Sequence, residues 1–434
     1  MGMKEFVSWG RVGRATPAQV HTISDRAIPL PASGERPVLA YGRGRSYGDV
    51  CLNNGGVLLH TSGLDRWISF DRITGVLRCE AGVTLREILA LVVPQGWFLP
   101  VTPGTREVTV GGAIANDVHG KNHHAAGTFG HHVRSLELLR SDGQRLHCSA
   151  ASHPQWFAAT VGGLGLTGLV TQAELQLLPV ANAFMDVQSV RFGCLAEFWE
   201  LNAQAESLWP YTVAWLDCAA RGAAIGRGVF GCARHAAPQP ELPAFRERRR
   251  SVLLTPPFSL INGASLKAFN WLYWHKARTG RSQSHYLPYF YPLDSIAHWN
   301  RLYGPAGFYQ YQCVIPPTVM QEAIDELVQR IAASGQGSFL AVLKTFGIRP
   351  SRGMLSFARP GATLALDFPN RGVATHRLFD DLDAIVRAAG GAIYAAKDSR
   401  MPADLFRSAY PKLPEFATFV DPGFGSNFWR RMCA

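Results

Sequence analysis

Glycine-rich loops are the feature of this 434-residue chain most suited to chemistry. The first loop, residues 42–49, reads Gly-Arg-Gly-Arg-Ser-Tyr-Gly-Asp and directly follows a strand-like run at 37–41. A second glycine-rich segment extends from 103 to 124. Glycines let main-chain N–H groups approach phosphate oxygens closely, and concave backbone segments of this kind bind anions. The two loops therefore predict a backbone-lined slot for a large phosphorylated cofactor.

Two glutamines and a lysine are further candidates for ligand contact. Gln310 and Gln312 alternate with tyrosines, so on a strand both amides would share one face and could bind sugar hydroxyls. Lys397 follows Tyr394-Ala-Ala. From local sequence alone, an exposed lysine at a helix start explains Lys397 as well as a functional role does.

Residues 163–168 match G-x-G-x-x-G, the dinucleotide-binding pattern. That pattern needs a strand before it and a helix after it. Here a helix-like segment at 156–160 comes first and an alternating strand at 170–176 follows. We therefore expect no nicotinamide site at this motif.

Five histidines lie close together in the sequence, but their spacing does not suit a metal site. Four form adjacent pairs, which point to opposite faces of a strand, and no H-x-x-x-H helix accompanies them. We expect no metal, and we expect His119 to form hydrogen bonds in a tight turn. The G-x-S-x-G elbow of α/β-hydrolases is also missing. The five are His119, His123, His124, His131 and His132.

The formal net charge is +11, which indicates either a soluble arginine-rich surface or attraction to an anionic partner. The eight cysteines include no C-x-x-C pair and are expected to be reduced thiols. No apolar stretch reaches the ~18 residues of a membrane span, and the N-terminus does not resemble a secretory signal. We expect a cytoplasmic protein, or one peripheral to a membrane.

Periodicity over residues 20–180 predicts an α+β fold, with strands at 57–60 and 76–79 and a helix at 85–92. A hairpin is expected to turn at 141–143. From Ala183 onward aromatic residues become dense, and a Pro-rich, basic loop is expected over 237–257. Amphipathic helices are expected at 318–334 and 379–389.

Basic and aromatic side chains are interleaved between 246 and 278. The run of arginines at 246–250 is explained equally well by solvated loop charge. The aromatic cluster at 269–274 lies among lysine and arginine, a composition that suits a membrane headgroup interface. These aromatics could also pack in a core.

Several strings together resemble the PCMH-type FAD-binding domain of the vanillyl-alcohol oxidase superfamily. They are 42–49, Pro-Gly-Thr-Arg at 103–106, Thr-Val-Gly-Gly-Ala-Ile-Ala at 109–115, 161–169, Asp-Pro at 421–422 and the closing 427–431. Three further strings, at 119–124, 303–312 and 396–400, are similar to the decaprenylphosphoryl-β-D-ribose oxidase family, the flavoprotein half of a ribose 2′-epimerase. The resemblance covers nearly the whole chain.

This resemblance implies a two-part FAD-binding domain at 1–182, completed by 390–434. A substrate-binding domain built on an antiparallel sheet is implied at 183–389. FAD is the implied cofactor. The implied flavin contacts are Tyr41, Gly42, Arg43, Gly44, Arg45, Ser46, Tyr47, Gly48, Gly104, Thr109, Val110, Gly111, Gly112, Asn116, Asp117, Val118, His119, Val170 and Tyr394.

Covalent members of the superfamily attach the flavin to a histidine at the position that Arg45 occupies here, so we expect dissociable FAD. Ala365 stands where mycobacterial members carry a cysteine, so inhibitors that trap that thiol should find no target. The resemblance implies catalytic roles for Lys397, His119 and Gln312. Lys397 matches a lysine near the reactive edge of the ring. The implied substrate contacts are Tyr47, Lys121, Trp215, Gln310, Gln312, Lys344 and Lys397.

The implied reaction oxidises the 2-hydroxyl of a polyprenylphosphoryl-β-D-ribose to a 2-keto sugar, which a separate short-chain reductase would convert to the arabinose form. One alternative is an alditol or aldonolactone oxidase acting on a soluble sugar. A third hypothesis is a non-catalytic basic module that binds nucleic acid. We expect a polyprenyl-phosphate sugar and peripheral membrane contact, and no nucleic-acid partner.

Overall fold

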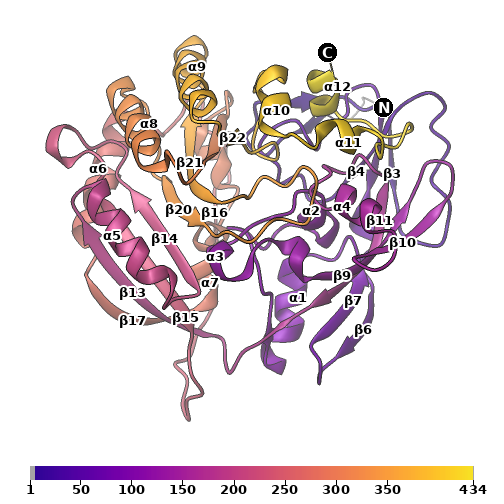
Figure 1. Ribbon diagram of the computed structural model, residues 1–434, viewed down its shortest axis with the longest axis horizontal. Helices are drawn as coiled ribbons and strands as arrows, with labels where there is room; N and C mark the ends of the chain where they lie inside the picture. The colour runs from indigo at the N-terminus through magenta and orange to yellow at the C-terminus, as the bar shows by residue number, and fades with distance from the viewer. Residues whose placement is uncertain (1–4, 434) are drawn as a thin grey trace.

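Two antiparallel sheets, one of eight strands and one of five, form the body of the protein (Figure 1). The structure is a computed structural model, and it describes residues 5–433. The chain combines helices with mainly antiparallel sheets, so the predicted α+β class is confirmed.

The N-terminal region contains the five-stranded sheet and a parallel three-stranded sheet in the order β3-β5-β4. Two short strands, β1 (Phe6–Val7) and β2 (Arg14–Ala15), pair ahead of them. The order in the larger sheet is β10-β9-β11-β7-β6. The strands of the two sheets are β3 (Gln19–Thr22), β4 (Val38–Tyr41), β5 (Val57–His60), β6 (Trp67–Asp71), β7 (Val76–Glu80), β9 (Val133–Leu139), β10 (Arg145–Ser149) and β11 (Leu169–Gln176).

Four helices accompany these strands, and β8 (Trp97–Phe98) pairs with β12 (Leu178–Pro179). Helix α1 begins with a capping box, in which Thr84 and Glu87 satisfy each other's backbone N–H groups. Its buried leucine, isoleucine and valine face the core next to the five-stranded sheet. The helices are α1 (Leu85–Val92), α2 (Val110–Ala115), α3 (His123–Ala126) and α4 (Pro154–Thr160).

The eight-stranded sheet has the order β17-β13-β15-β14-β20-β21-β19-β22. Helices α5 (Leu195–Glu206), α8 (Met320–Ser334) and α9 (Val373–Ala388) pack against one face of it. Its strands are β13 (Phe184–Phe192), β14 (Tyr211–Leu216), β15 (Gly228–His235), β17 (Gly280–His285), β19 (Phe308–Ile315), β20 (Val342–Phe346), β21 (Gly361–Pro369) and β22 (Ala392–Ile393).

The last part of the chain returns to the N-terminal region, where it lies beside β3 and β4 (yellow in Figure 1). Helices α10 (Ala403–Ala409), α11 (Leu413–Ala417) and α12 (Asn427–Cys433) form this return. Val38 pairs with Phe424, and Arg431 forms ion pairs with Asp49 and Asp398. The domain boundaries expected from the sequence, 1–182 with 390–434 and 183–389, stay a prediction, and β22 beyond the second boundary still pairs with β19.

Most elements expected from periodicity are present. The strands at 57–60 and 76–80, the helix at 85–92 and the hairpin at 133–149 are confirmed. Helix α9 begins six residues before the expected start at 379, because the polar first turn carries no apolar period. Residues 163–168 follow helix α4 and precede β11, which confirms that the motif lacks its dinucleotide-binding context.

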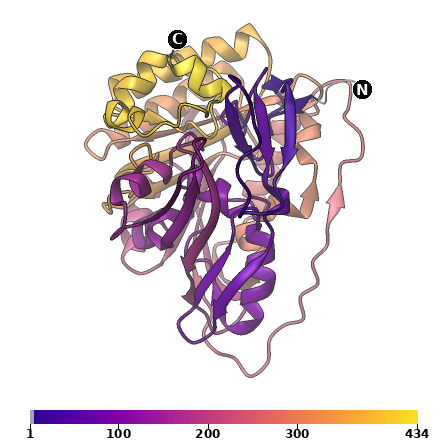
Figure 2. The ribbon, with the colours of Figure 1, turned by 90° about the vertical axis from the view of Figure 1, so that its right-hand side faces the viewer.

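A long segment between β15 and helix α6 (Gly263–Lys276) crosses the outside of the molecule. Residues 236–249 form neither helix nor strand, as expected for the Pro-rich loop. Figure 2 shows the segment as an extended strap at the right of the view. It is held by β16 (Arg250–Ser251), which pairs in parallel with β18 (Ile296–Ala297). Across residues 5–433, every helix is too short or too polar to cross a membrane.

Candidate functional site

A cavity of about 750 Å³ lies between the glycine-rich loops and the face of the eight-stranded sheet that the helices leave open. Its wall contains residues of both loops, of seven strands of the eight-stranded sheet and of the segment after β22. This volume falls in the upper part of the roughly 300–1,000 Å³ range of small-molecule and cofactor pockets. The cavity is therefore large enough for a cofactor together with part of a substrate.

Side chains alternate between the two faces of the sheet, and the polar ones on adjacent strands point into the cavity. Gln310 and Gln312 on β19 line the cavity, whereas Tyr309 and Tyr311 contact Phe379 of α9 on the other face. The predicted sharing of one face by the two amides is confirmed. Strand β21 likewise turns Thr363, Ala365 and Asp367 toward the cavity, and β20 contributes Lys344.

The first glycine loop needs glycine at two positions for geometric reasons. Gly44 has φ +59°, and a Cβ there would collide with the Tyr41 hydroxyl. A Cβ on Gly48 would lie 1.5 Å from the carbonyl oxygen of Asp398, so the loop packs directly on the C-terminal segment. The loop backbone thus approaches both its own chain and the cavity closely.

Buried polar atoms without partners face the same region. Tyr394 donates from its hydroxyl to the Asn116 carbonyl at 2.9 Å, while the Asn116 Oδ1 has no partner among the described residues. His119 Nε2 lies 3.1 Å from the Gln312 amide nitrogen, and His119 Nδ1 is buried without a partner there. Buried groups of this kind are normally satisfied, so these atoms fit a polar ligand such as a flavin.

Most of the flavin and substrate contacts that the family resemblance implies line this cavity. Tyr41, Gly48, Val110 and Asp117 do not line it. Val110 is fully buried in α2, and Asp117 accepts hydrogen bonds from Gly130 N and Ser356 Oγ. We infer that these four support the loops from behind. The residues in the lining are Gly42, Arg43, Gly44, Arg45, Ser46, Tyr47, Gly104, Thr109, Gly111, Gly112, Asn116, Val118, His119, Lys121, Val170, Trp215, Gln310, Gln312, Lys344, Tyr394 and Lys397.

Three lysines contribute positive charge to the cavity wall. Lys121 donates to the Tyr289 carbonyl and lies over the Tyr289 ring, and Lys344 donates to the Gly120 carbonyl. Burial lowers the pKa of Lys121 to about 8, and burial together with the other two lysines lowers the pKa of Lys344 to about 7. Burial also lowers the pKa of Lys397, which the charge of Asp367 opposes. Such a cluster is stabilised by an anion.

The aromatic and imidazole groups of the wall are neutral. Burial and the nearby Lys344 lower the pKa of His119 well below its usual value. Since the Gln312 amide donates to its Nε2, His119 carries its proton on Nδ1.

The Trp215 indole donates to the Phe339 carbonyl at 2.8 Å and lies against Tyr273 of α6. Arg45 lies over the Trp9 ring at 4.1 Å.

Several wall residues were not expected from the sequence. Asp367 is the most notable, because it is fully buried and carries the charge opposite to the lysines. The alternation of polar and apolar residues in β21 could have identified it. The others include Tyr289, Asp294, Trp299 and Thr363.

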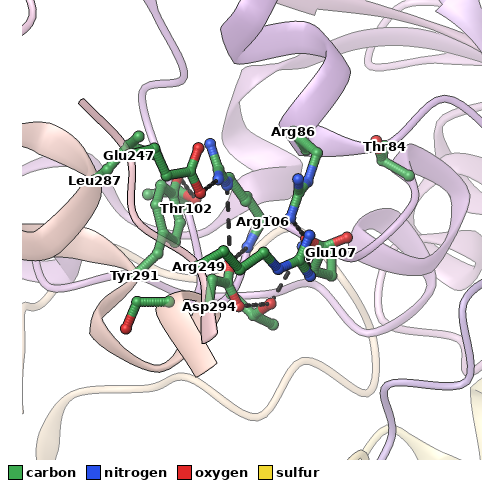
Figure 3. A network of polar contacts seen from close by, with 12 residues as sticks. Thr84, Arg86, Thr102, Arg106, Glu107, Glu247, Arg249, Leu287, Tyr291 and Asp294 are labelled. Carbon is green, nitrogen blue, oxygen red and sulfur yellow. Dashed lines mark hydrogen bonds and ion pairs between the residues drawn. The ribbon is translucent and has the colours of Figure 1, made fainter. Parts of the chain in front are cut away.

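An ion-pair network, shown in Figure 3, joins the strap to the N-terminal region beside the cavity. Arg106 pairs with Glu247 of the strap, and its backbone N–H donates to the cavity-lining Asp294 at 2.9 Å. Glu107 pairs with Arg86 and with Arg249 of the strap. Part of the arginine run is therefore bound to acidic partners rather than only solvated.

The remaining histidines contact separate backbone groups. His123 Nδ1 accepts from Gly347 N at 3.1 Å, and His124 Nε2 lies 2.9 Å from the Trp209 carbonyl. His131 and His132 contact the carbonyls of Pro350 and Ala126. Over residues 5–433, no three His, Cys, Asp or Glu side chains are grouped as metal ligands.

Comparisons with known proteins agree with this geometry. A family model described as an FAD binding domain matches residues 20–149, which contain both glycine loops. Decaprenylphosphoryl-beta-D-ribose oxidase of Mycolicibacterium smegmatis is 38% identical over 99% of this chain and 97% of its own. The putative D-arabinono-1,4-lactone oxidase of Neurospora crassa is 26% identical over 36% of this chain and 27% of its own. Human Delta(24)-sterol reductase is 32% identical over 26% of this chain and 22% of its own. The similarity to the Mycolicibacterium smegmatis oxidase spans both the loops and the sheet wall.

Proposed function

The chain belongs to the decaprenylphosphoryl-β-D-ribose oxidase family, and from this premise we propose that it oxidises the 2-hydroxyl of a polyprenylphosphoryl-β-D-ribose to the 2-keto sugar. It is an FAD-dependent oxidoreductase with a PCMH-type FAD-binding domain. The observation that carries the substrate proposal is the cavity with three buried lysines and the amides of β19 on one wall.

Within this cavity we assign a separate role to each polar residue of the wall. Lys121 and Lys344 attract the substrate phosphate, and Gln310 bonds sugar hydroxyls. Gln312 holds His119 in one tautomer, so that its Nδ1–H points to a bound group. Lys397 stabilises negative charge that develops during proton loss. When bound, FAD supplies the acceptor for the hydride that leaves the sugar carbon.

We propose that the FAD is held without a covalent bond. Arg45 stands at the attachment position, and its guanidinium is already engaged with Trp9. Denaturation followed by ultrafiltration tests this directly: all yellow colour should pass the filter. Colour retained with the polypeptide would contradict it.

An alditol or aldonolactone oxidase acting on a soluble sugar is the alternative. The aldonolactone oxidase of Neurospora crassa matches only 36% of this chain. A soluble neutral sugar would also leave the lysine cluster without an anion. The polyprenylphosphoryl substrate is therefore better supported.

Anaerobic absorbance spectra test the proposed function. The bound flavin should lose its visible absorbance on addition of a short-chain polyprenylphosphoryl ribose. Alditols and aldonolactones should leave the absorbance unchanged. Bleaching by the soluble sugars and not by the phosphorylated one would favour the alternative.

Two partners follow from the same proposal. A separate short-chain reductase would convert the keto sugar to the arabinose form. A lipid-linked substrate also requires access to a membrane surface, and helix α6 suits such contact. Trp271 is 56% exposed and Leu272 49%, while Tyr273 on the same helix lines the cavity. The helix contains two lysines and no acidic residue, which suits anionic headgroups.

A further inference from the structure

The carboxylate of Asp367 is fully buried in the cavity wall and is only half satisfied. Its Oδ1 accepts a hydrogen bond from the Gln310 amide at 2.6 Å. Its Oδ2 has no partner among residues 5–433. Leaving a buried charged oxygen unpaired is costly, so such an atom points to a ligand that completes it.

The positive charge of Lys397 favours the ionised form of Asp367, which is the form that can accept a proton. Lys397 lowers the pKa of Asp367, and Asp367 raises the pKa of Lys397. No ion pair joins the two side chains among the described residues. The other titratable neighbours whose pKa depends on Asp367 are Tyr47 and Tyr303, both neutral. The wall thus presents one carboxylate oxygen and one ammonium group that are not paired directly.

The other candidates for a base have less acceptor capacity. His119 is neutral, but its Nε2 already accepts from Gln312 and its Nδ1 carries the proton. Lys397 can accept a proton only after it has lost its own, and the charge of Asp367 opposes that loss. Asp367 Oδ2 can accept a proton whenever the carboxyl group is ionised.

We propose that Asp367 is the proton acceptor for the substrate hydroxyl, a role that rests on the proposed oxidation. The hydroxyl proton passes to Oδ2 and forms the neutral carboxylic acid. The C–H bond breaks, and its hydrogen and electron pair leave together as hydride to the oxidised flavin. The carbon–oxygen single bond becomes the carbonyl, and the carboxylic acid later returns its proton to solvent.

Burial raises the pKa of Asp367, whereas Gln310 and Lys397 lower it. The rate of flavin reduction should therefore fall as pH decreases through the raised pKa of Asp367. Removing the Gln310 amide should raise that pKa further and move the acidic limb of the profile to higher pH. If Asp367 had a purely structural role, removal of the Gln310 amide would not move the acidic limb of the pH profile.

The test is stopped-flow flavin reduction against pH in the FAD-loaded wild type, Asp367→Asn and Gln310→Ala. We expect Asp367→Asn to slow reduction roughly 100-fold or more and to abolish the acidic limb, as for loss of a general base. We expect Gln310→Ala to move the limb upward. Asp383→Asn is the matched control, because Asp383 is a buried carboxylate of α9 that accepts a hydrogen bond from Tyr311, on the face of the sheet away from the cavity.

Infrared titration gives a readout that does not depend on turnover. Burial also raises the pKa of Asp49, Asp117 and Asp383, so the readout is a difference between variants. One wild-type carboxyl band that titrates above the usual range should be absent from Asp367→Asn and present in Asp383→Asn. If Asp367→Asn does not fold, the pH profile of Gln310→Ala and the titration of the wild type still test the role of Asp367. An unmoved limb in Gln310→Ala, or wild-type rates in Asp367→Asn, would overturn the proposal. A wild type that no polyprenylphosphoryl ribose reduces would instead overturn the proposed function.

Discussion

The Nζ of Lys397 lies 3.9 Å from the centre of the Tyr47 ring. This contact joins the first glycine loop to the segment after β22, and both residues line the cavity. A cation on an aromatic face in a buried site is held in place as well as stabilised. Lys397 is thus positioned by a residue some 350 positions away.

Replacement of Lys397 by alanine should slow flavin reduction roughly 100-fold, because one cation that stabilises developing negative charge is lost. The FAD content should remain that of the wild type. Single-turnover bleaching and the flavin-to-protein absorbance ratio measure the two quantities. Lys412→Ala, at an exposed lysine, is the control. Unchanged bleaching in Lys397→Ala would remove this lysine from the mechanism.

Replacement of Gly48 by alanine should weaken FAD binding and stability together. The added Cβ would collide with the Asp398 backbone, and relieving that collision would displace the first loop. We expect a loss of about 1–3 kcal/mol, as for other strained or overpacked sites. Thermal unfolding and FAD retention on gel filtration measure it. Gly263→Ala, where the Cβ has open space, should behave like the wild type.

Alkylating reagents should leave position 365 unmodified, because Ala365 offers no thiol in the cavity wall. Cys51 also lines the cavity, but burial raises its pKa to about 12 and keeps the thiol protonated. Ala365→Cys should therefore add one modified peptide in mass spectrometry. Equal labelling of the two proteins would contradict this account of the wall.

Substrate affinity should fall as pH rises through neutrality. Lys344 has a pKa lowered to about 7 by burial and by Lys121 and Lys397, so it loses its charge above that pH. An anionic phosphate raises this pKa on binding, and binding should take up a proton. Calorimetry in buffers of different ionisation enthalpy measures that uptake.

Lys344→Arg provides the control, since arginine stays charged over this range. Its affinity should depend less on pH than that of the wild type. His119 and His123 also face Lys344, but their lowered pKa values keep them neutral through the same range. A wild-type affinity that does not change across pH 7 would exclude Lys344 as the phosphate ligand.

Changing Trp271 and Leu272 of α6 to alanine should weaken binding to vesicles that contain anionic lipid. Each exposed apolar side chain contributes in proportion to the area it buries, so we expect roughly a tenfold loss for the pair. Cosedimentation with phosphatidylglycerol vesicles measures it. Ile73→Ala, at an isolated exposed residue in a turn, is the control. Equal sedimentation of all three proteins would reject α6 as a membrane contact.

The sequence predicted those parts of the fold that local pattern determines. Helices α1 and α8 and the alternation along β19 follow from residue spacing, because one side of each element faces a core. The exposure of α6 was not decided by its sequence, since its aromatic residues fall on all sides of the helix.

Long-range contacts explain most of what was missed. Arg106 and Glu247 lie 141 positions apart, and the apposition that makes them a pair depends on the course of the strap. Asp367 was overlooked, although the alternation along β21 places it on the same face as Thr363 and Ala365. Only the neighbouring strands β19 and β20 reveal what it faces.

The alternation in β21 has one more consequence. Thr363, Ala365 and Asp367 share a face, so a shift of one residue would bury all three among the helices and turn Leu364 and Leu366 into the cavity. Insertions or deletions inside this strand should therefore abolish activity. The chemical character of this side of the cavity thus depends on the register of a single strand.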